Sequence, residues 1–246
     1  MIDNLQGQFV ILTGAAAGLG YAIAQAYARE GLRLALMDVQ AEKLQRVAAE
    51  AEQAGAECLP IVVDLSDAAA TQDAMQQALD RFGTPRAVVH NAALLVERPM
   101  SAITFEQWRR ETDIILQAAF ILSKAVWSPM LEARSGSIVY LSSGSGIKGF
   151  VNEAAYCPAK HGQEGLMKVL SMEGAEYNIA VNTITPGAPM NTPMSASHYP
   201  PELRTRWIDP ALLTPAFVWL AKIDASDSTG QRLDAWQLSE SLRNAN

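Results

Sequence analysis

The sequence is poor in cysteine and histidine, the residues that most often build disulfide frameworks and transition-metal sites. Its 246 residues include two cysteines, Cys58 and Cys157, and three scattered histidines, His90, His161 and His198. The cysteines form no CxxC pattern, and the histidines show no metal-ligand spacing. We therefore expect neither a disulfide framework nor a metal site.

Basic residues are also few. The chain has 19 Lys and Arg against 26 Asp and Glu, which gives a formal net charge of −7. Nucleic-acid binding depends on basic patches, and the one Arg-Arg pair, Arg109-Arg110, is expected on a solvated, mixed-charge helix face. We expect no nucleic-acid partner.

The sequence shows no sign of a secretory leader or of a membrane helix. Met1 to Asn4 contains no basic segment, unlike the start of a signal peptide. The uncharged stretch Phe9 to Ala28 is interrupted by glycines, Thr13 and Gln25, so a strand, a turn and a helix explain it better than a membrane span. We expect a cytoplasmic protein that has no membrane partner.

What the sequence does contain is a glycine-rich turn between an apolar run and a helical pattern. Phe9 to Leu12 is apolar and partly β-branched, as in a buried strand, and Tyr21 to Arg29 carries Ala, Ile and Tyr at helical spacing. Between them, Thr13 to Gly20 reads T-G-x-x-x-G-x-G. Such a turn lets the backbone approach a ligand, and the helix N-terminus that follows suits a pyrophosphate. A tight turn without a ligand is the alternative.

The next apolar run favours the ligand. Leu32 to Asp38 ends in a carboxylate about 20 residues after Gly18, where dinucleotide folds place the ribose-binding acid. A carboxylate there binds the ribose 2′-hydroxyl and repels a 2′-phosphate, and Ala17 supplies no positive charge. The sequence therefore predicts NAD as the cofactor. The alternative role for Asp38 is to cap the turn that follows it.

Strand and helix patterns alternate along the whole chain. This alternation predicts an α/β fold with a parallel sheet and helices on both faces, in a single domain covering residues 1–246. Residues 188–210 hold many prolines and no clean period, which predicts an irregular segment that acts as a mobile substrate lid. The expected strands are 9–12, 32–38, 58–63, 86–90, 137–141, 179–184 and 230–233, and the expected helices are 21–29, 41–54, 67–82, 104–133, 155–177 and, as the last one, 210–221.

A second group of residues suits acid–base chemistry. Tyr156 and Lys160 are four residues apart and share one helix face. Pro158 lacks an N–H, so the helix is expected to begin close to Tyr156. A nearby ammonium favours the phenolate and lowers the pKa of a tyrosine toward neutrality. Ser143 follows a strand, as Gly20 follows the first strand, so both are expected at the carboxyl edge of the sheet.

Over nearly its whole length, the sequence resembles the short-chain dehydrogenase/reductase family. The resemblance implies a seven-stranded, Rossmann-like, doubly wound sheet, a homotetramer or homodimer, and hydride transfer between NAD and a secondary alcohol or ketone. It implies that Tyr156 is the acid–base catalyst, that Lys160 holds the ribose and tunes Tyr156, and that Ser143 orients the substrate oxygen. The cofactor residues that it implies are Thr13, Gly14, Gly18, Leu19, Gly20, Asp38, Asp64, Leu65, Asn91, Ala92, Tyr156, Lys160, Pro186, Gly187 and the lid residue Thr192.

The sequence departs from the family pattern in places that bear on catalysis. Members of the family commonly carry a helix-borne asparagine that completes a proton relay through water to the lysine, and Ile115 takes its place here. An isoleucine side chain cannot hydrogen-bond to water. The fourth-strand motif has His90 in place of an asparagine, the spacing from Pro186 to Thr192 is one residue longer than usual, and Asp234 is followed by Ala-Trp instead of Gly-Gly.

Three functions therefore remain open. The first is an active NAD-dependent oxidoreductase. The second, motivated by Ile115, is a dinucleotide-binding sensor or assembly subunit with little catalysis, and the third is non-redox chemistry such as epimerisation or dehydration. The substrate is equally open: four apolar residues could line a pocket, pack the lid or form a subunit contact, and three polar residues could bind hydroxyl groups or be solvated. These are Met190, Met194, Tyr199 and Trp207 in the first group and Lys148, Asn152 and Glu153 in the second.

Overall fold

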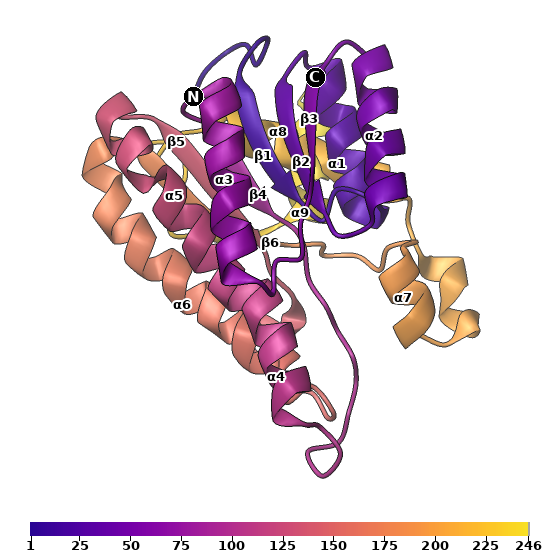
Figure 1. Ribbon diagram of the computed structural model, residues 1–246. Coiled ribbons are helices and arrows are strands. Elements are labelled where there is room, and N and C mark those ends of the chain that lie inside the picture. The colour runs from indigo at the N-terminus through magenta and orange to yellow at the C-terminus, as the bar shows by residue number, and fades with distance from the viewer. Residues whose placement is uncertain (246) are drawn as a thin grey trace.

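The chain folds around one parallel sheet of seven strands in the order β3-β2-β1-β4-β5-β6-β7 (Figure 1). The computed structural model describes residues 1–245. The order reverses between β1 and β4, and such folds bind their ligands at the carboxyl ends of the strands beside this reversal. The predicted seven-stranded, doubly wound parallel sheet is confirmed. Its strands are β1 (Phe9–Thr13), β2 (Arg33–Asp38), β3 (Glu57–Val62), β4 (Ala87–His90), β5 (Gly136–Leu141), β6 (Ile179–Thr185) and β7 (Arg232–Asp234).

Helices cover both faces of the sheet because successive strand residues point to opposite faces. Phe9 and Ile11 of β1 pack into one apolar core, and Val10 and Leu12 pack into the other. In Figure 1, α3, α5 and α6 lie together on one side of the sheet, while α4 and α7 extend past the edge where the strands end. The helices are α1 (Gly18–Arg29), α2 (Ala41–Gln53), α3 (Ala68–Phe82), α4 (Phe105–Thr112), α5 (Ala118–Ala133), α6 (Tyr156–Gly174), α7 (Pro193–His198), α8 (Thr214–Lys222) and α9 (Ala235–Asn244).

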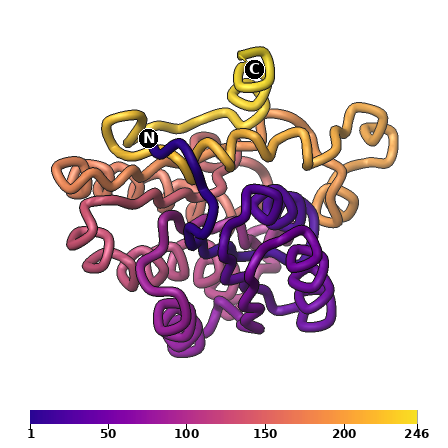
Figure 2. The backbone as a smooth tube through the Cα atoms, turned by 90° about the horizontal axis from the view of Figure 1, so that it is seen from above, coloured from indigo at the N-terminus to yellow at the C-terminus, as the bar shows by residue number. Residues whose placement is uncertain are grey.

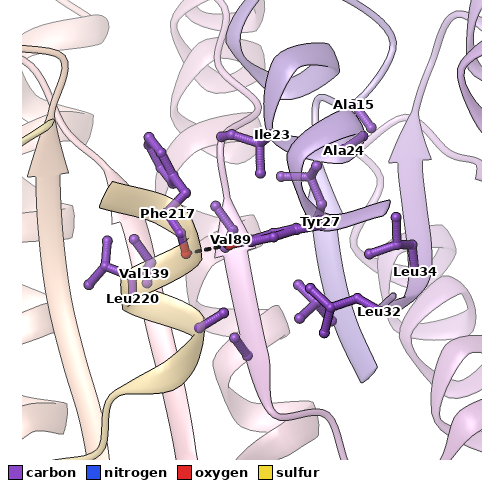
Figure 3. Close-up of a cluster of buried hydrophobic side chains, with 14 of the residues drawn as sticks. Ala15, Ile23, Ala24, Tyr27, Leu32, Leu34, Val89, Val139, Phe217 and Leu220 are labelled. Carbon is purple, nitrogen blue, oxygen red and sulfur yellow. Dashed lines mark hydrogen bonds between the residues drawn. The ribbon is translucent and has the colours of Figure 1, made fainter. Parts of the chain in front are cut away.

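The core on the α1 side joins the first helix to a late one. Tyr27 of α1 is fully buried, and its hydroxyl donates a hydrogen bond to the Phe217 carbonyl of α8 at 3.0 Å. Figure 3 shows the Tyr27 hydroxyl directed at the main-chain carbonyl of Phe217, with Val89 and Val139 of the central strands nearby. The segments that lie far apart in sequence are therefore neighbours, and Figure 2 shows the N-terminal segment beside the late, yellow part of the chain.

The segment Phe105–Ala133 is one long helix with a break inside it. A capping box starts it: the Thr104 side chain accepts from the Gln107 N–H, and the Gln107 side chain accepts from the Thr104 N–H. Between α4 and α5, residues Asp113–Gln117 form a π-helical turn, η1, a feature that often occurs at functional sites. The whole segment is long and apolar enough to cross a membrane, but Leu122 and Val126 are fully buried in the core beside the sheet, so core packing explains its composition.

Three sequence-based expectations about elements were wrong. Residues 188–210 are not irregular throughout, because they contain α7 and the 3₁₀ helix Pro201–Arg206. A proline inside a helix is expected to disturb it, but α5 continues through Pro129 to Ala133. The helix after Pro210 is not the last one, since α9 follows β7 with the Asp234 side chain accepting from the Gln237 N–H. Aspartate followed three residues later by glutamine is a helix-start signal that could have predicted α9.

Arg86, the residue before β4, connects the beginning of that strand to the C-terminal end of α8. Its side chain is buried, and it donates to the carbonyl oxygens of Ala221, Lys222 and Ile223 and to the Ser135 hydroxyl. These carbonyls lie at the negative end of the α8 dipole, where a cation is stabilising. Burial lowers the pKa of Arg86, but the group stays charged.

We predict that Arg86→Met destabilises the protein by about 3 kcal/mol, because it leaves buried carbonyls without a donor. The free energy of unfolding in urea, followed by circular dichroism, measures the effect. Arg81→Met is the matched control: Arg81 is exposed, pairs with the exposed Glu57 and lies over the Phe82 ring, so its loss should change stability by less than about 1 kcal/mol. Equal effects of the two substitutions would contradict this role for Arg86.

Candidate active site

A cavity of about 940 Å³ opens at the carboxyl ends of the strands. It runs from the turn after β1, past the ends of β2, β4, β5 and β6, to the segment around α7. The structure brings the predicted site residues together around it: all of them line the cavity except Thr13 and Gly20, which lie behind the first turn. Those at the wall are Gly14, Gly18, Leu19, Asp38, Asp64, Leu65, Asn91, Ala92, Ser143, Tyr156, Lys160, Pro186, Gly187 and Thr192.

The turn after β1 requires its glycines. Gly14 has φ +66°, and a Cβ there would lie 2.8 Å from the Ala92 Cα. A Cβ on Gly20 would lie 1.9 Å from the Gly14 carbonyl oxygen, so α1 could not pack against the turn. The Asn91 amide holds the same turn by donating to the Thr13 and Gly14 carbonyls.

The first turn of α1 fits a phosphate group. Its N-cap residue, Ala17, offers no side-chain acceptor to the N–H groups of the helix start. Ala17, Gly18 and Leu19 face the cavity, so these N–H groups and the positive end of the helix dipole are available to an anion. The site therefore fits the pyrophosphate of a dinucleotide.

Asp38 is held rigidly at the end of β2. One carboxylate oxygen accepts from the Ala16 N–H at 3.0 Å, and the other accepts from the Gln40 N–H at 2.9 Å. The carboxylate thus caps its own turn and also faces the cavity, where Ala17 and Val39 are its neighbours in the wall. Both roles considered for Asp38 are compatible, because each oxygen has a second lone pair for a ligand.

Asp64 is paired with a residue that the sequence analysis placed on a solvated surface. Arg110 donates to Asp64 at 2.8 Å and lines the cavity. Although burial opposes it, hydrogen bonds from Ser66 and Arg110 lower the pKa of Asp64. The expectation for Arg110 was therefore incomplete: its guanidinium forms part of the cavity wall between α4 and the end of β3.

Tyr156, Lys160 and Ser143 meet at the centre of the cavity. Helix α6 begins at Tyr156, as Pro158 predicted, and the Lys160 ammonium lies 5.5 Å from the Tyr156 ring centre. Lys160 is almost fully buried and donates to the Leu141 carbonyl at 2.5 Å. The Ser143 hydroxyl accepts from the Ser145 N–H and faces the same space.

Burial sets the charge state of the pair in the absence of ligand. It raises the pKa of Tyr156, and the Ser143 hydroxyl opposes that rise. It also lowers the pKa of Lys160 to about 7, opposed by the charge of Glu164. The lowering of the tyrosine pKa expected from a nearby ammonium does not appear in the ligand-free site, where burial is the largest influence on Tyr156.

An ion pair behind the site fixes Ser143. Arg232 of β7 pairs with Glu164 of α6 at 3.2 Å and donates to the Ser143 carbonyl at 2.9 Å. Glu164 also accepts from the hydroxyls of Ser142 and Thr183. The backbone after β5 is thereby tied to α6, which carries Tyr156 and Lys160.

The segment around α7 closes one side of the cavity. Met190, Met194, Tyr199 and Trp207 all line it, which favours the pocket among the three roles left open for them. Glu153 also lines the cavity, while Lys148 and Asn152 do not. Movement of 188–210 as a lid stays a prediction.

Two residues next to the site were not assigned a role from the sequence. His90 was noted only as a departure from the family motif, and Gln163 was not noted at all. Both side chains are buried and donate to the Ile115 carbonyl, and Gln163 also accepts from Lys160. Gln163 lies three residues after Lys160 and therefore on the same helix face, a spacing that could have revealed it. Among residues 1–245, no group of three or more His, Cys, Asp or Glu is placed to hold a metal ion.

The family model and the similar proteins all point to the same family. The family model for short chain dehydrogenase matches residues 8–202. An uncharacterized oxidoreductase, YciK of Escherichia coli, is 34% identical over 239 residues, covering 95% of this chain and 93% of its own. D-threitol dehydrogenase of Mycolicibacterium smegmatis is 34% identical over 183 residues, covering 74% of this chain and 70% of its own.

The solved structures agree. A crystal structure from Beutenbergia cavernae, described as a candidate NAD(P)-dependent gluconate 5-dehydrogenase with NADP bound at low occupancy, superposes with a TM-score of 0.87. It is 29% identical and covers 96% of this chain and 98% of its own.

We predict that Gly20→Ala abolishes dinucleotide binding while leaving the chain folded, because the added methyl group collides with the Gly14 carbonyl. Fluorescence titration with NADH, alongside circular dichroism, measures both properties. Gly165→Ala in α6 is the matched control, since a Cβ there meets no atom within 4 Å, and alanine in an exposed helix should stabilise by about 0.5–1 kcal/mol. Normal NADH binding by Gly20→Ala would contradict the assigned role of the turn.

Proposed function

The chain belongs to the short-chain dehydrogenase family, and we propose that it is an NAD-dependent oxidoreductase that interconverts a secondary alcohol and the corresponding ketone. The observation that carries this proposal is the shared cavity of Ser143, Tyr156, Lys160 and the glycine turn. Relatives named as dehydrogenases of polyols support alcohol or ketone substrates. A protein that only binds a dinucleotide and turns nothing over would not need Ser143, Tyr156 and a buried Lys160 in the same cavity.

The chain's own residues account for binding of the dinucleotide. The N–H groups at the start of α1 would hold the pyrophosphate, and Asp38 would accept hydrogen bonds from the adenine-side ribose. Lys160 keeps one N–H for the nicotinamide-side ribose after its two protein partners are counted. When bound, the nicotinamide supplies or accepts the hydride.

Tyr156 would move the proton. In ketone reduction its hydroxyl donates a proton to the substrate oxygen, and in alcohol oxidation its phenolate takes that proton back. Because burial raises the pKa of Tyr156, the residue is protonated at neutral pH, which suits reduction. Oxidation needs the phenolate and should become faster as the pH rises. Ser143 would orient the oxygen through its hydroxyl.

The preference for NAD is supported by the surroundings of Asp38. The residues that line the cavity beside it, Ala17, Val39 and Gln40, carry no positive charge that could bind a 2′-phosphate. Related structures hold NADP, so the preference rests on these side chains alone. The homo-oligomer and the cytoplasmic location stay predictions; exposed Phe120 on α5 and Met172 on α6 are candidate contact residues.

We predict that Tyr156→Phe lowers kcat by at least about 100-fold, because it removes the acid–base hydroxyl. Turnover of a panel of vicinal diols, sugar acids and cyclic ketones, followed by NADH absorbance, tests this. NADH binding should persist in the variant. A wild-type protein that binds NADH but turns over nothing faster than Tyr156→Phe would favour the non-catalytic function instead.

We predict that Asp38→Ala weakens the binding of NADH by roughly 10- to 100-fold, because a charge-assisted hydrogen bond to the ribose is lost. The same change should strengthen NADPH binding, because a negative charge no longer faces the 2′-phosphate. Titration of the wild type and of Asp38→Ala with NADH and with NADPH gives the ratio of the two affinities in each protein. An unchanged ratio would show that Asp38 only caps its turn.

A further inference from the structure

The Ile115 carbonyl is bonded by two side chains from different elements. It lies in the π-helical turn η1 and accepts from His90 Nε2 of β4 and from Gln163 Nε2 of α6, each at 3.0 Å. A carbonyl oxygen has two lone pairs. Both are therefore used by protein donors, and no position is left on this oxygen for a bridging water.

The direction of each hydrogen bond follows from this acceptor. Because the Ile115 oxygen can only accept, His90 Nε2 must carry the proton, and its Nδ1 must accept from the Thr13 hydroxyl at 2.8 Å. Thr13 Oγ1 in turn accepts from the N–H groups of Asn91 and Ala92. Burial lowers the pKa of His90 to about 3, so the ring stays neutral.

Gln163 connects the same carbonyl to the lysine. Its Nε2 donates to Ile115, so its Oε1 is the atom that accepts from the Lys160 ammonium at 3.0 Å. Gln163 is fully buried. Lys160 thus has two fixed acceptors, the Leu141 carbonyl and the Gln163 amide, and one N–H directed to neither.

We propose that Gln163 is a positioning residue that holds Lys160 in the active site, its side-chain amide bridging the Lys160 ammonium and the Ile115 carbonyl where a proton relay would need a water. This inference rests on the proposed function, because Lys160 is taken to contact the cofactor there. An amide does not exchange protons as water does. Gln163 therefore holds the Lys160 ammonium in place without passing protons from it to the Ile115 carbonyl.

The charge state of Lys160 gives a test that does not depend on turnover. The titratable groups around it are His90 on β4 and Tyr156 and Glu164 on α6, while Asp113 in η1 pairs with Arg109. An acceptor on the ammonium favours its charged form. Removing that acceptor should lower the Lys160 pKa, and giving it a negative charge should raise the pKa.

We expect Gln163→Leu to lower the proton affinity of Lys160 by about tenfold and Gln163→Glu to raise it by a similar factor. A ¹³C NMR titration of the lysine side chains in the nucleotide-free protein measures this, with Lys160→Met assigning the signal. If Gln163→Leu does not fold, Gln163→Met replaces it, and Gln163→Glu keeps an acceptor oxygen beside the lysine. An unchanged Lys160 pKa in the folded variants would overturn the proposal.

Kinetics give the second readout. Gln163→Leu should lower kcat/KM by about 10- to 100-fold and shift the pH profile in the direction opposite to Gln163→Glu. Gln25→Leu is the matched control: it also replaces a glutamine whose amide nitrogen is buried, in this case without a partner, and should leave both quantities unchanged. A loss of stability with an unshifted pH profile would mean that Gln163 is merely structural. A wild type that neither binds NADH nor turns over would instead overturn the proposed function, while the NMR titration would still report on Gln163.

Discussion

The shared acceptor at Ile115 is the interaction on which the site depends. Helix, sheet and glycine turn meet at this one carbonyl: His90 reaches it from β4, and Gln163 reaches it from α6. His90 also holds Thr13, which anchors the turn under the dinucleotide. The geometry that places a pyrophosphate and the geometry that places Lys160 are therefore set by one connected network, in which the Ile115 oxygen and both ring nitrogens of His90 have partners.

Such a network explains why polar groups can be buried so deeply behind a cavity. A neutral histidine, a glutamine and an ammonium would each be costly in the core without partners. Here the π-helical turn exposes a carbonyl to two donors, and the isoleucine side chain beside it packs against Tyr156 and Ala159. Ile115 is thus an apolar wall for the tyrosine, and its main-chain oxygen, not its side chain, takes part in the polar network. Side chains from β4 and α6 thus supply the donors to the Ile115 carbonyl.

Much of this could be predicted from the sequence because the signals were local. The strand-turn-helix pattern around Gly14 and the i, i+4 pair of Tyr156 and Lys160 depend on spacing alone, and the structure places them at one cavity. What could not be predicted depends on contacts between distant segments. Nothing near Gln163 or His90 in sequence shows that both face the Ile115 carbonyl, and nothing near Arg110 shows that Asp64 lies opposite. From the sequence, Ile115 offers only an apolar side chain, because the partners of its carbonyl cannot be seen there.

The central claim is that a side chain, and not a water, connects Lys160 to Ile115. A high-resolution crystal structure of the NADH complex tests it most directly. The account predicts continuous density for the Gln163 amide between the Lys160 ammonium and the Ile115 carbonyl, with no water between them. An ordered water in that place, with Gln163 turned away from both groups, would contradict it.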